Sequence, residues 1–180
     1  MRKIYIVLTC TNTFLSYIVK GYTRKKYSHV SIALDKNLNE MYSFGRLNAY
    51  NPFIGGFVQE SPDYGTFKRF HNTKTKIFSL DVTDEQYNQI KNNIKKIYLD
   101  KDSYRFNTIG LFCVALHKRI HREKCFYCAE FVKYIFEQSN LEIDLPELIK
   151  PEDFANLEGA EEIYTGILRE YHKVSCFYNF

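Results

Sequence analysis

Hydrophobic residues recur at every second position in several segments, which is the pattern of β-strands. Residues 3–9 (KIYIVLT) form a short run rich in β-branched residues and predict a buried strand. Residues 27–45 contain two alternating stretches around the turn signal Asp-Lys-Asn, and these predict a β-hairpin. Further strands are expected at about 67–71, 76–82 and 162–171.

Other segments repeat their hydrophobic residues every three or four positions and predict amphipathic helices. One begins after Thr83, which can form a capping box with Gln86. A second begins at Cys128, which falls on the apolar stripe of its helix. Further helices are expected at 13–21, at 105–117 and from Pro151.

Residues 46–66 follow neither period and contain Asn-Pro, Gly-Gly and Ser-Pro-Asp-Tyr-Gly, so we interpret them as a loop or flap. No internal repeat, low-complexity tract or linker divides the chain, and residues 1–180 are expected to form one domain. The order of the elements predicts an α+β protein with a mostly antiparallel sheet packed against helices.

The composition is that of a folded globular protein with a mild positive charge. Of the 180 residues, 45% are hydrophobic and 26% are charged, which lies outside the disordered range. The net charge is +4, and the basic clusters at 20–26 and 117–124 fit solvated surface or a rim that attracts an anionic substrate. We expect no nucleic-acid partner, and no segment approaches the ~20 apolar residues of a membrane span.

The five cysteines are odd in number, scattered, and not preceded by a recognisable secretory leader. We therefore expect free thiols and a cytoplasmic location. Cys128 differs from the others because it stands where a helix begins, and the helix dipole there favours a thiolate. A buried structural cysteine would give the same pattern.

A thiol nucleophile needs a base to take its proton. Among the five histidines, His29 is the best placed, because it begins a predicted strand. The same face of that strand continues with Ser31 and Ala33, whose small side chains leave room for a helix terminus. A lone strand histidine is also typical of a core or edge position.

The segments Tyr-Ser-His-Val-Ser-Ile-Ala-Leu and Cys-Ala-Glu-Phe-Val, in this order, resemble the circularly permuted branch of the NlpC-type papain-like superfamily. This branch includes lecithin:retinol acyltransferase-like proteins and YiiX-like hydrolases. The resemblance implies a permuted papain-like fold and a cysteine hydrolase or acyltransferase, with Cys128 as nucleophile and His29 as general base and later acid. The substrate would be a small-molecule, peptide or lipid-derived acyl group, and no cofactor or metal is implied.

The resemblance leaves open which residue orients the imidazole. Relatives carry His, Glu, Asn or Gln on the strand paired with the histidine strand, here residues 39–44. Ser43 aligns with the glutamate of the YiiX-like proteins, Glu40 is the nearest carboxylate on that strand, and Glu60 could return through the following loop. Tyr104 is either an oxyanion or substrate contact or a core aromatic residue.

Three alternatives to a thiol enzyme remain at this point. A zinc site is one, because four possible ligands follow the pattern H-x3-H-x3-C-x2-C: His117, His121, Cys125 and Cys128. Structural zinc sites usually separate their ligand pairs by a longer loop, which weighs against it. A redox Cys-x-x-C site would need a preceding βαβ unit. A catalytically silent binding module on the same fold is the third alternative.

Overall fold

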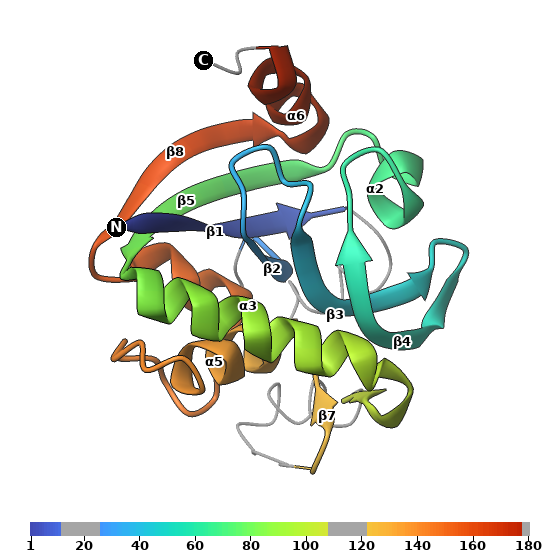
Figure 1. Cartoon of the computed structure of the whole chain (residues 1–180). Coiled ribbons are helices and arrows are strands. Elements are labelled where there is room, and N and C mark those ends of the chain that lie inside the picture. Colours follow the sequence, from blue (N-terminus) through green and yellow to red (C-terminus); the bar gives the residue numbers. More distant parts are fainter. Residues whose placement is uncertain (12–25, 108–121, 178–180) are drawn as a thin grey trace.

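The computed structural model describes residues 1–11, 26–107 and 122–177, and a six-stranded antiparallel sheet forms its centre (Figure 1). The spatial order of the strands is β4-β3-β2-β1-β5-β8. Their bounds are β1 Arg2–Cys10, β2 His29–Ala33, β3 Met41–Asn48, β4 Asn51–Glu60, β5 Lys74–Val82 and β8 Ala160–Ile167. A separate parallel pair joins β6 (Arg105–Phe106) to β7 (Cys125–Phe126).

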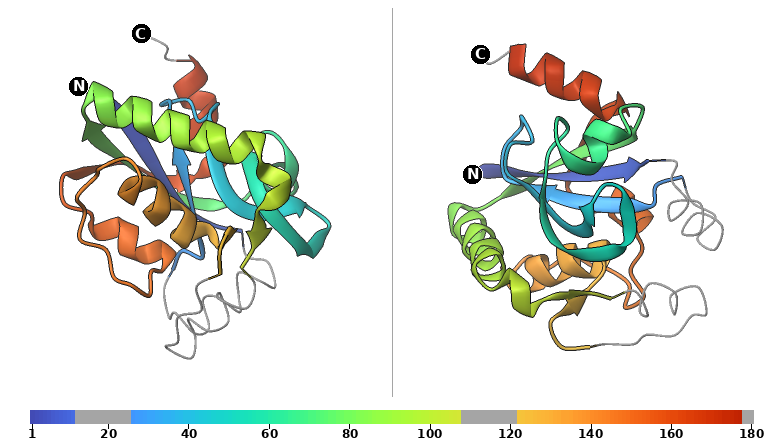
Figure 2. Two further views of the ribbon diagram at one scale, coloured as in Figure 1. Left: turned by 60° about the horizontal axis from the view of Figure 1, so that its bottom comes forward. Right: turned by 90° about the vertical axis from the view of Figure 1, so that its right-hand side faces the viewer.

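Helices cover both faces of the sheet (Figure 2). One face carries α3 (Asp84–Leu99), α5 (Cys128–Glu137) and the 3-10 helix η2 (Pro151–Asn156), and a further 3-10 turn, η1 (Lys101–Ser103), follows α3. The other face carries α2 (Gly65–Arg69) and α6 (Leu168–Phe177). Buried hydrophobic residues accordingly form a large cluster with α3 and α5 and a smaller one with α2 and α6. The predicted α+β class with a mostly antiparallel sheet is confirmed.

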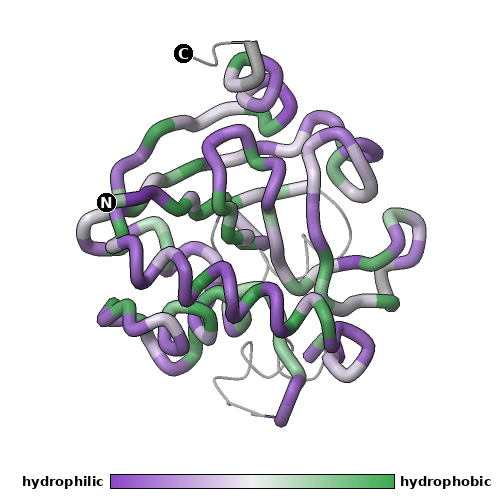
Figure 3. Tube along the Cα trace, in the orientation of Figure 1, coloured by the Kyte–Doolittle hydropathy of each residue, from purple (hydrophilic) through white to green (hydrophobic). Residues whose placement is uncertain are grey.

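The helix α3 forms where the sequence predicts it. The Thr83 hydroxyl accepts the N–H of Gln86 at 3.1 Å, and the Gln86 side chain accepts the N–H of Thr83 at 2.9 Å. The hydrophobic stripe is buried against the sheet, while the outward positions are mostly hydrophilic (Figure 3). Burying each of these side chains contributes about 1.5–3 kcal/mol. None of the helices in the described ranges has both the length and the apolar character needed to cross a membrane.

The predicted hairpin is also present, as β2 and β3. The Asp35 carboxylate closes its turn by accepting the backbone N–H groups of Asn39 at 3.1 Å and Glu40 at 2.7 Å. The strands expected at 3–9 and 76–82 are β1 and β5, and the helices expected at Cys128 and Pro151 are α5 and η2.

The expected loop at 46–66 is wrong, because the end of β3 and the whole of β4 occupy most of it and pair with each other. The Gly-Gly pair that suggested a loop instead admits close neighbours into a strand. An ideal Cβ at Gly55 would lie only 2.8 Å from Cγ of Phe106, and one at Gly56 would lie 3.2 Å from Leu47. The next predicted strand, 67–71, is also wrong, because its first residues belong to α2.

Two further boundaries differ from the expectation. Residues 105 and 106 form β6 rather than the start of a helix, and the last strand begins at Ala160 and ends at Ile167, where α6 follows. Short apolar runs of this kind do not distinguish a strand from a helix by period alone. The helix expected at 13–21 and the remainder of the one expected at 105–117 lie outside the described residues.

Gly55→Ala should destabilise the fold by about 1–3 kcal/mol, the usual cost of overpacking. The added methyl group would meet the Phe106 ring at 2.8–3.1 Å and push β4 away from β6. Gly56→Ala is the control, because its methyl group would meet only the end of the half-exposed Leu47 side chain. Urea unfolding of both variants measures the difference, and equal stabilities would contradict this packing.

Candidate active site

The imidazole of His29 contacts the carboxylate of Glu60. Nε2 of His29 lies 2.9 Å from Oε1 and 3.2 Å from Oε2 of Glu60. The pair is largely withdrawn from solvent, since the side chains are 20% and 10% exposed. The ring of Phe67 in α2 lies 6.4 Å from the imidazole, centroid to centroid, and covers this face of the sheet.

Cys128 is the second group that interacts with the imidazole, and it does so through negative charge and a hydrogen bond. The thiol is buried and free, at the first residue of α5. Because Nε2 is engaged by Glu60, Nδ1 is the ring nitrogen left to face the sulfur. The structure therefore brings together the two residues that the sequence analysis paired across ninety-nine positions, and it adds Glu60 to them.

The charge of the imidazole follows from these neighbours. Burial by itself lowers the pKa of His29, but Glu60 and the Cys128 sulfur outweigh it, each through negative charge and a hydrogen bond. The net result is a pKa of about 10, so His29 is an imidazolium at neutral pH. A positive charge beside a cysteine sulfur favours the thiolate.

Glu60 reaches the imidazole across an intervening strand. β3 lies between β2 and β4, and the residues of β3 on this face include Ser43 and Gly45. An ideal Cβ at Gly45 would lie 3.3 Å from both Glu60 Oε1 and His29 Cε1. The glycine therefore leaves the space through which carboxylate and imidazole meet.

The two candidates on the paired strand, Ser43 and Glu40, are placed elsewhere. The buried hydroxyl of Ser43 donates to the carbonyl of Val30 at 2.7 Å. The Glu40 carboxylate lies at the surface, 3.6 Å from Nζ of Lys91. Both candidates lie on β3, the strand next to β2. The carboxylate that contacts the imidazole instead comes from β4, a segment that the sequence pattern predicts to be a loop. Glu60, the third alternative, occupies the position.

The start of α5 is fixed by a side chain that the sequence analysis missed. Glu130 Oε2 accepts the backbone N–H of Tyr127 at 3.1 Å and the side-chain N–H of Asn107 at 3.2 Å. Asn107 is fully buried, and its own N–H donates to the carbonyl of Phe126 at 2.9 Å. Glu130 three residues after Tyr127 was the available signal, since a carboxylate at this position caps a helix.

Tyr104 is a core aromatic residue in this structure. Its ring stacks on Phe126 with the centroids 6.2 Å apart and meets Phe44 edge-on at 6.3 Å. Burial raises the pKa of its phenol, as do nearby anionic groups. The alternative role as an oxyanion contact gains no support from this placement.

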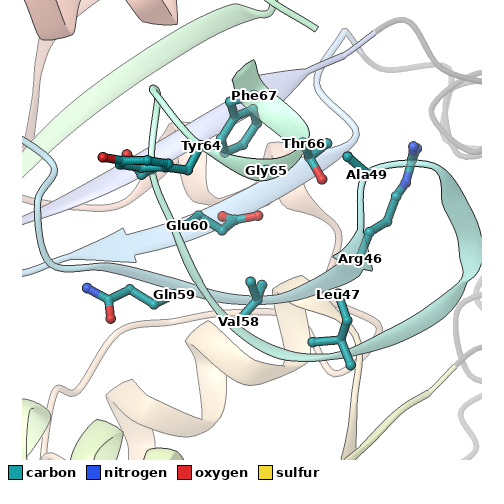
Figure 4. A pocket seen from close by; sticks show the side chains of 11 residues that line it. Arg46, Leu47, Ala49, Val58, Gln59, Glu60, Tyr64, Gly65, Thr66 and Phe67 are labelled. Carbon is teal, nitrogen blue, oxygen red and sulfur yellow. The ribbon is translucent and has the colours of Figure 1, made fainter. Parts of the chain in front are cut away.

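A cavity of about 220 Å³ adjoins the far side of Glu60. It lies between the β3–β4 hairpin and α2, and its lining is mixed in polarity (Figure 4). Its lining residues include Arg46, Val58, Glu60, Thr66 and Phe67. The carboxylate that binds His29 is thus also part of the cavity wall.

The zinc hypothesis is only partly covered by the described residues. His117 and His121 lie outside them, and Cys128 forms its hydrogen bond with His29. Within the described ranges, His, Cys, Asp and Glu side chains form no group of three that could hold a metal ion.

Comparison with known proteins assigns no family: no family model and no curated protein matches the chain. The function of the chain is therefore inferred from the geometry of Cys128, His29 and Glu60.

The charge on His29 should make the stability of the protein depend on pH. Its folded-state pKa of about 10 exceeds the ordinary 6.5, so its contribution is fully present below pH 6.5 and is lost as the pH rises toward 10. In this window the free energy of unfolding should fall by at most about 1.4 kcal/mol per pH unit, the value for one proton. Glu60→Gln removes the charge that raises the pKa and should flatten this dependence. Both are compared in a Cys128→Ser background, because a thiol that gives up its proton in the folded state would cancel the proton that His29 retains.

Urea unfolding of Cys128→Ser and of Cys128→Ser with Glu60→Gln, at several pH values between 6.5 and 9, measures the difference. Glu40→Gln in the same background is the matched control, because it removes a surface carboxylate that lies 3.6 Å from Nζ of Lys91. A pH dependence that is the same in Cys128→Ser and in both of these variants would contradict the pairing of Glu60 with a charged His29.

Proposed function

We propose that this protein is a cysteine-dependent hydrolase or acyltransferase that acts on an amide, ester or thioester carbonyl. Cys128 is the nucleophile, His29 is the general acid and base, and Glu60 orients and charges the imidazole. The single observation that carries this proposal is the imidazole held between the carboxylate and the sulfur.

The chemistry proceeds through an acyl-enzyme. The Cys128 sulfur attacks the carbonyl carbon, and the carbonyl π-electrons move to the oxygen. The first backbone N–H groups of α5 have no acceptor within the helix, and they provide donors for this oxyanion. His29 then gives its proton to the leaving group as the bond to carbon breaks, which leaves a thioester and a neutral imidazole.

The second half of the reaction reverses the roles. Neutral His29 takes a proton from water or another acceptor, whose oxygen or nitrogen attacks the thioester carbon. The sulfur leaves as a thiolate beside the regenerated imidazolium, and the product departs with the acyl group. Glu60 keeps the ring oriented throughout, as the third member of a catalytic triad does.

The topology supports a permuted papain-like assignment within this proposal. The histidine strand β2 precedes the cysteine helix α5 in the chain, and the two elements pack together. This is the order that the resemblance implies for the permuted branch. The thiols of Cys125 and Cys128, which are not in disulfides, fit a reducing compartment, and we propose a cytoplasmic location on that basis.

The proposal predicts that Cys128 is the most reactive thiol of the folded protein. Iodoacetamide at neutral pH, followed by peptide mass spectrometry, should label Cys128 faster than Cys10 or Cys125, because Cys128 has an imidazolium beside it. His29→Ala should remove this preference. It should also lower the hydrolysis of an activated ester by about 10²–10⁴-fold, the usual contribution of a general acid and base.

Cys125→Ser is the matched control, since it removes another buried free thiol three residues away and should leave both measurements unchanged. Cys128→Ser should abolish ester hydrolysis while retaining the fold. Slow and equal labelling of all thiols, or full ester hydrolysis by Cys128→Ser, would instead favour a silent binding module.

A further inference from the structure

A second polar group binds the Glu60 carboxylate beside His29. The Ser31 hydroxyl donates to Oε2 of Glu60 at 2.5 Å, while Oε1 makes the shorter contact with the imidazole, at 2.9 Å. Ser31 is fully buried and lies two residues after His29, so both side chains project from the same face of β2. The carboxylate is therefore clamped between two neighbours on one strand.

Without the hydrogen bond from Ser31, the Glu60 carboxylate is able to rotate into the neighbouring cavity. Glu60 borders the cavity of about 220 Å³, and Arg46 lines the same cavity (Figure 4). Arg46 is only partly exposed, and burial lowers the pKa of its guanidinium, as does the positive charge of nearby Arg69. A rotated carboxylate would enter a positively charged space, where an anion is favoured.

We infer that Ser31 is a positioning residue of the site: its hydroxyl keeps the Glu60 carboxylate against His29 and out of the cavity shared with Arg46. The catalytic consequence of this inference rests on the proposed function, but the positioning itself does not. A bound carboxylate that has lost one of its two partners still contacts the imidazole, though for a smaller part of the time. The imidazolium is then less stabilised.

An alternative role for Ser31 predicts the opposite sign. A hydroxyl that only donates to a fixed carboxylate draws negative charge away from it, so removing the hydroxyl would strengthen the hold on the imidazolium. Under that role the pKa of His29 would rise in a Ser31 variant. Under positioning the pKa of His29 falls, because the carboxylate moves away.

Ser31→Ala tests the inference by NMR titration of the His29 ring protons. The pKa of His29 should fall from about 10 by about one unit, the size expected for weakening one charge-assisted hydrogen bond. Ser43→Ala is the matched control. Ser43 is equally buried and close by, but its hydroxyl donates to the Val30 carbonyl and not to the carboxylate. It should leave the titration of His29 unchanged.

An unchanged or raised pKa of His29 in Ser31→Ala would overturn the inference, and so would an equal fall in Ser43→Ala. Thermal unfolding checks that each variant is folded, and Ser31→Cys, a weaker donor of similar shape, provides the same test if Ser31→Ala is not. The titration needs no turnover. A lowered pKa in a protein whose Cys128 never reacts would refute the proposed function and leave the positioning role intact, while normal reactivity with an unmoved pKa would do the reverse.

Discussion

The contact between the Glu60 carboxylate and the His29 imidazole sets the chemical character of this site. It joins the edge strand β4 to β2 across an intervening strand. Burial by itself would lower the pKa of His29 and leave it neutral, and a neutral imidazole would not favour a thiolate beside it. The negative carboxylate, together with the Cys128 sulfur, reverses this, so the contact with Glu60 both orients the ring and helps to keep it charged.

Much of the local sequence makes sense as a consequence of that contact. Gly45 leaves space for the contact between the Glu60 carboxylate and the imidazole. Gly55 lets β4 lie close to β6, and the end of β4 carries Glu60 beside His29. Ser31 supplies a second bond to the carboxylate. The pairing of Asn107 with Glu130 fixes where α5 begins and hence where the sulfur of its first residue lies.

The parts of the fold that the sequence predicted are those with a strong local signal. The capping box of α3, the turn at Asp35 and the apolar run of β1 each specify an element without reference to the rest of the chain. The pairing of Cys128 with His29 rests on the resemblance to the permuted papain-like branch, because each position is marked by its own element but no local signal brings the two together. The signals for α3, the Asp35 turn and β1 act over a few residues, so they do not depend on the tertiary structure.

The parts that were not predicted depend on contacts between distant segments. The sequence predicts a loop in place of β4 because Gly55 and Gly56 resemble turn residues. Only the folded structure shows that these glycines leave room for Phe106 and Leu47 beside a strand. With β4 predicted as a loop, Ser43 and Glu40 on the paired strand are the nearer candidates for the orienting residue, and Glu60 is a third alternative. Only the folded sheet brings Glu60 to the imidazole, thirty-one residues along the chain.

We propose that the Cys128 sulfur beside the charged His29 imidazole forms a covalent acyl intermediate. The most direct measurement is peptide mass spectrometry after brief incubation with an activated acyl ester and acid quenching. If Cys128 is the nucleophile, we expect one acyl group, located on Cys128 as a thioester that hydroxylamine removes. Acyl groups spread evenly over lysines and other cysteines, with none enriched at Cys128, would contradict it.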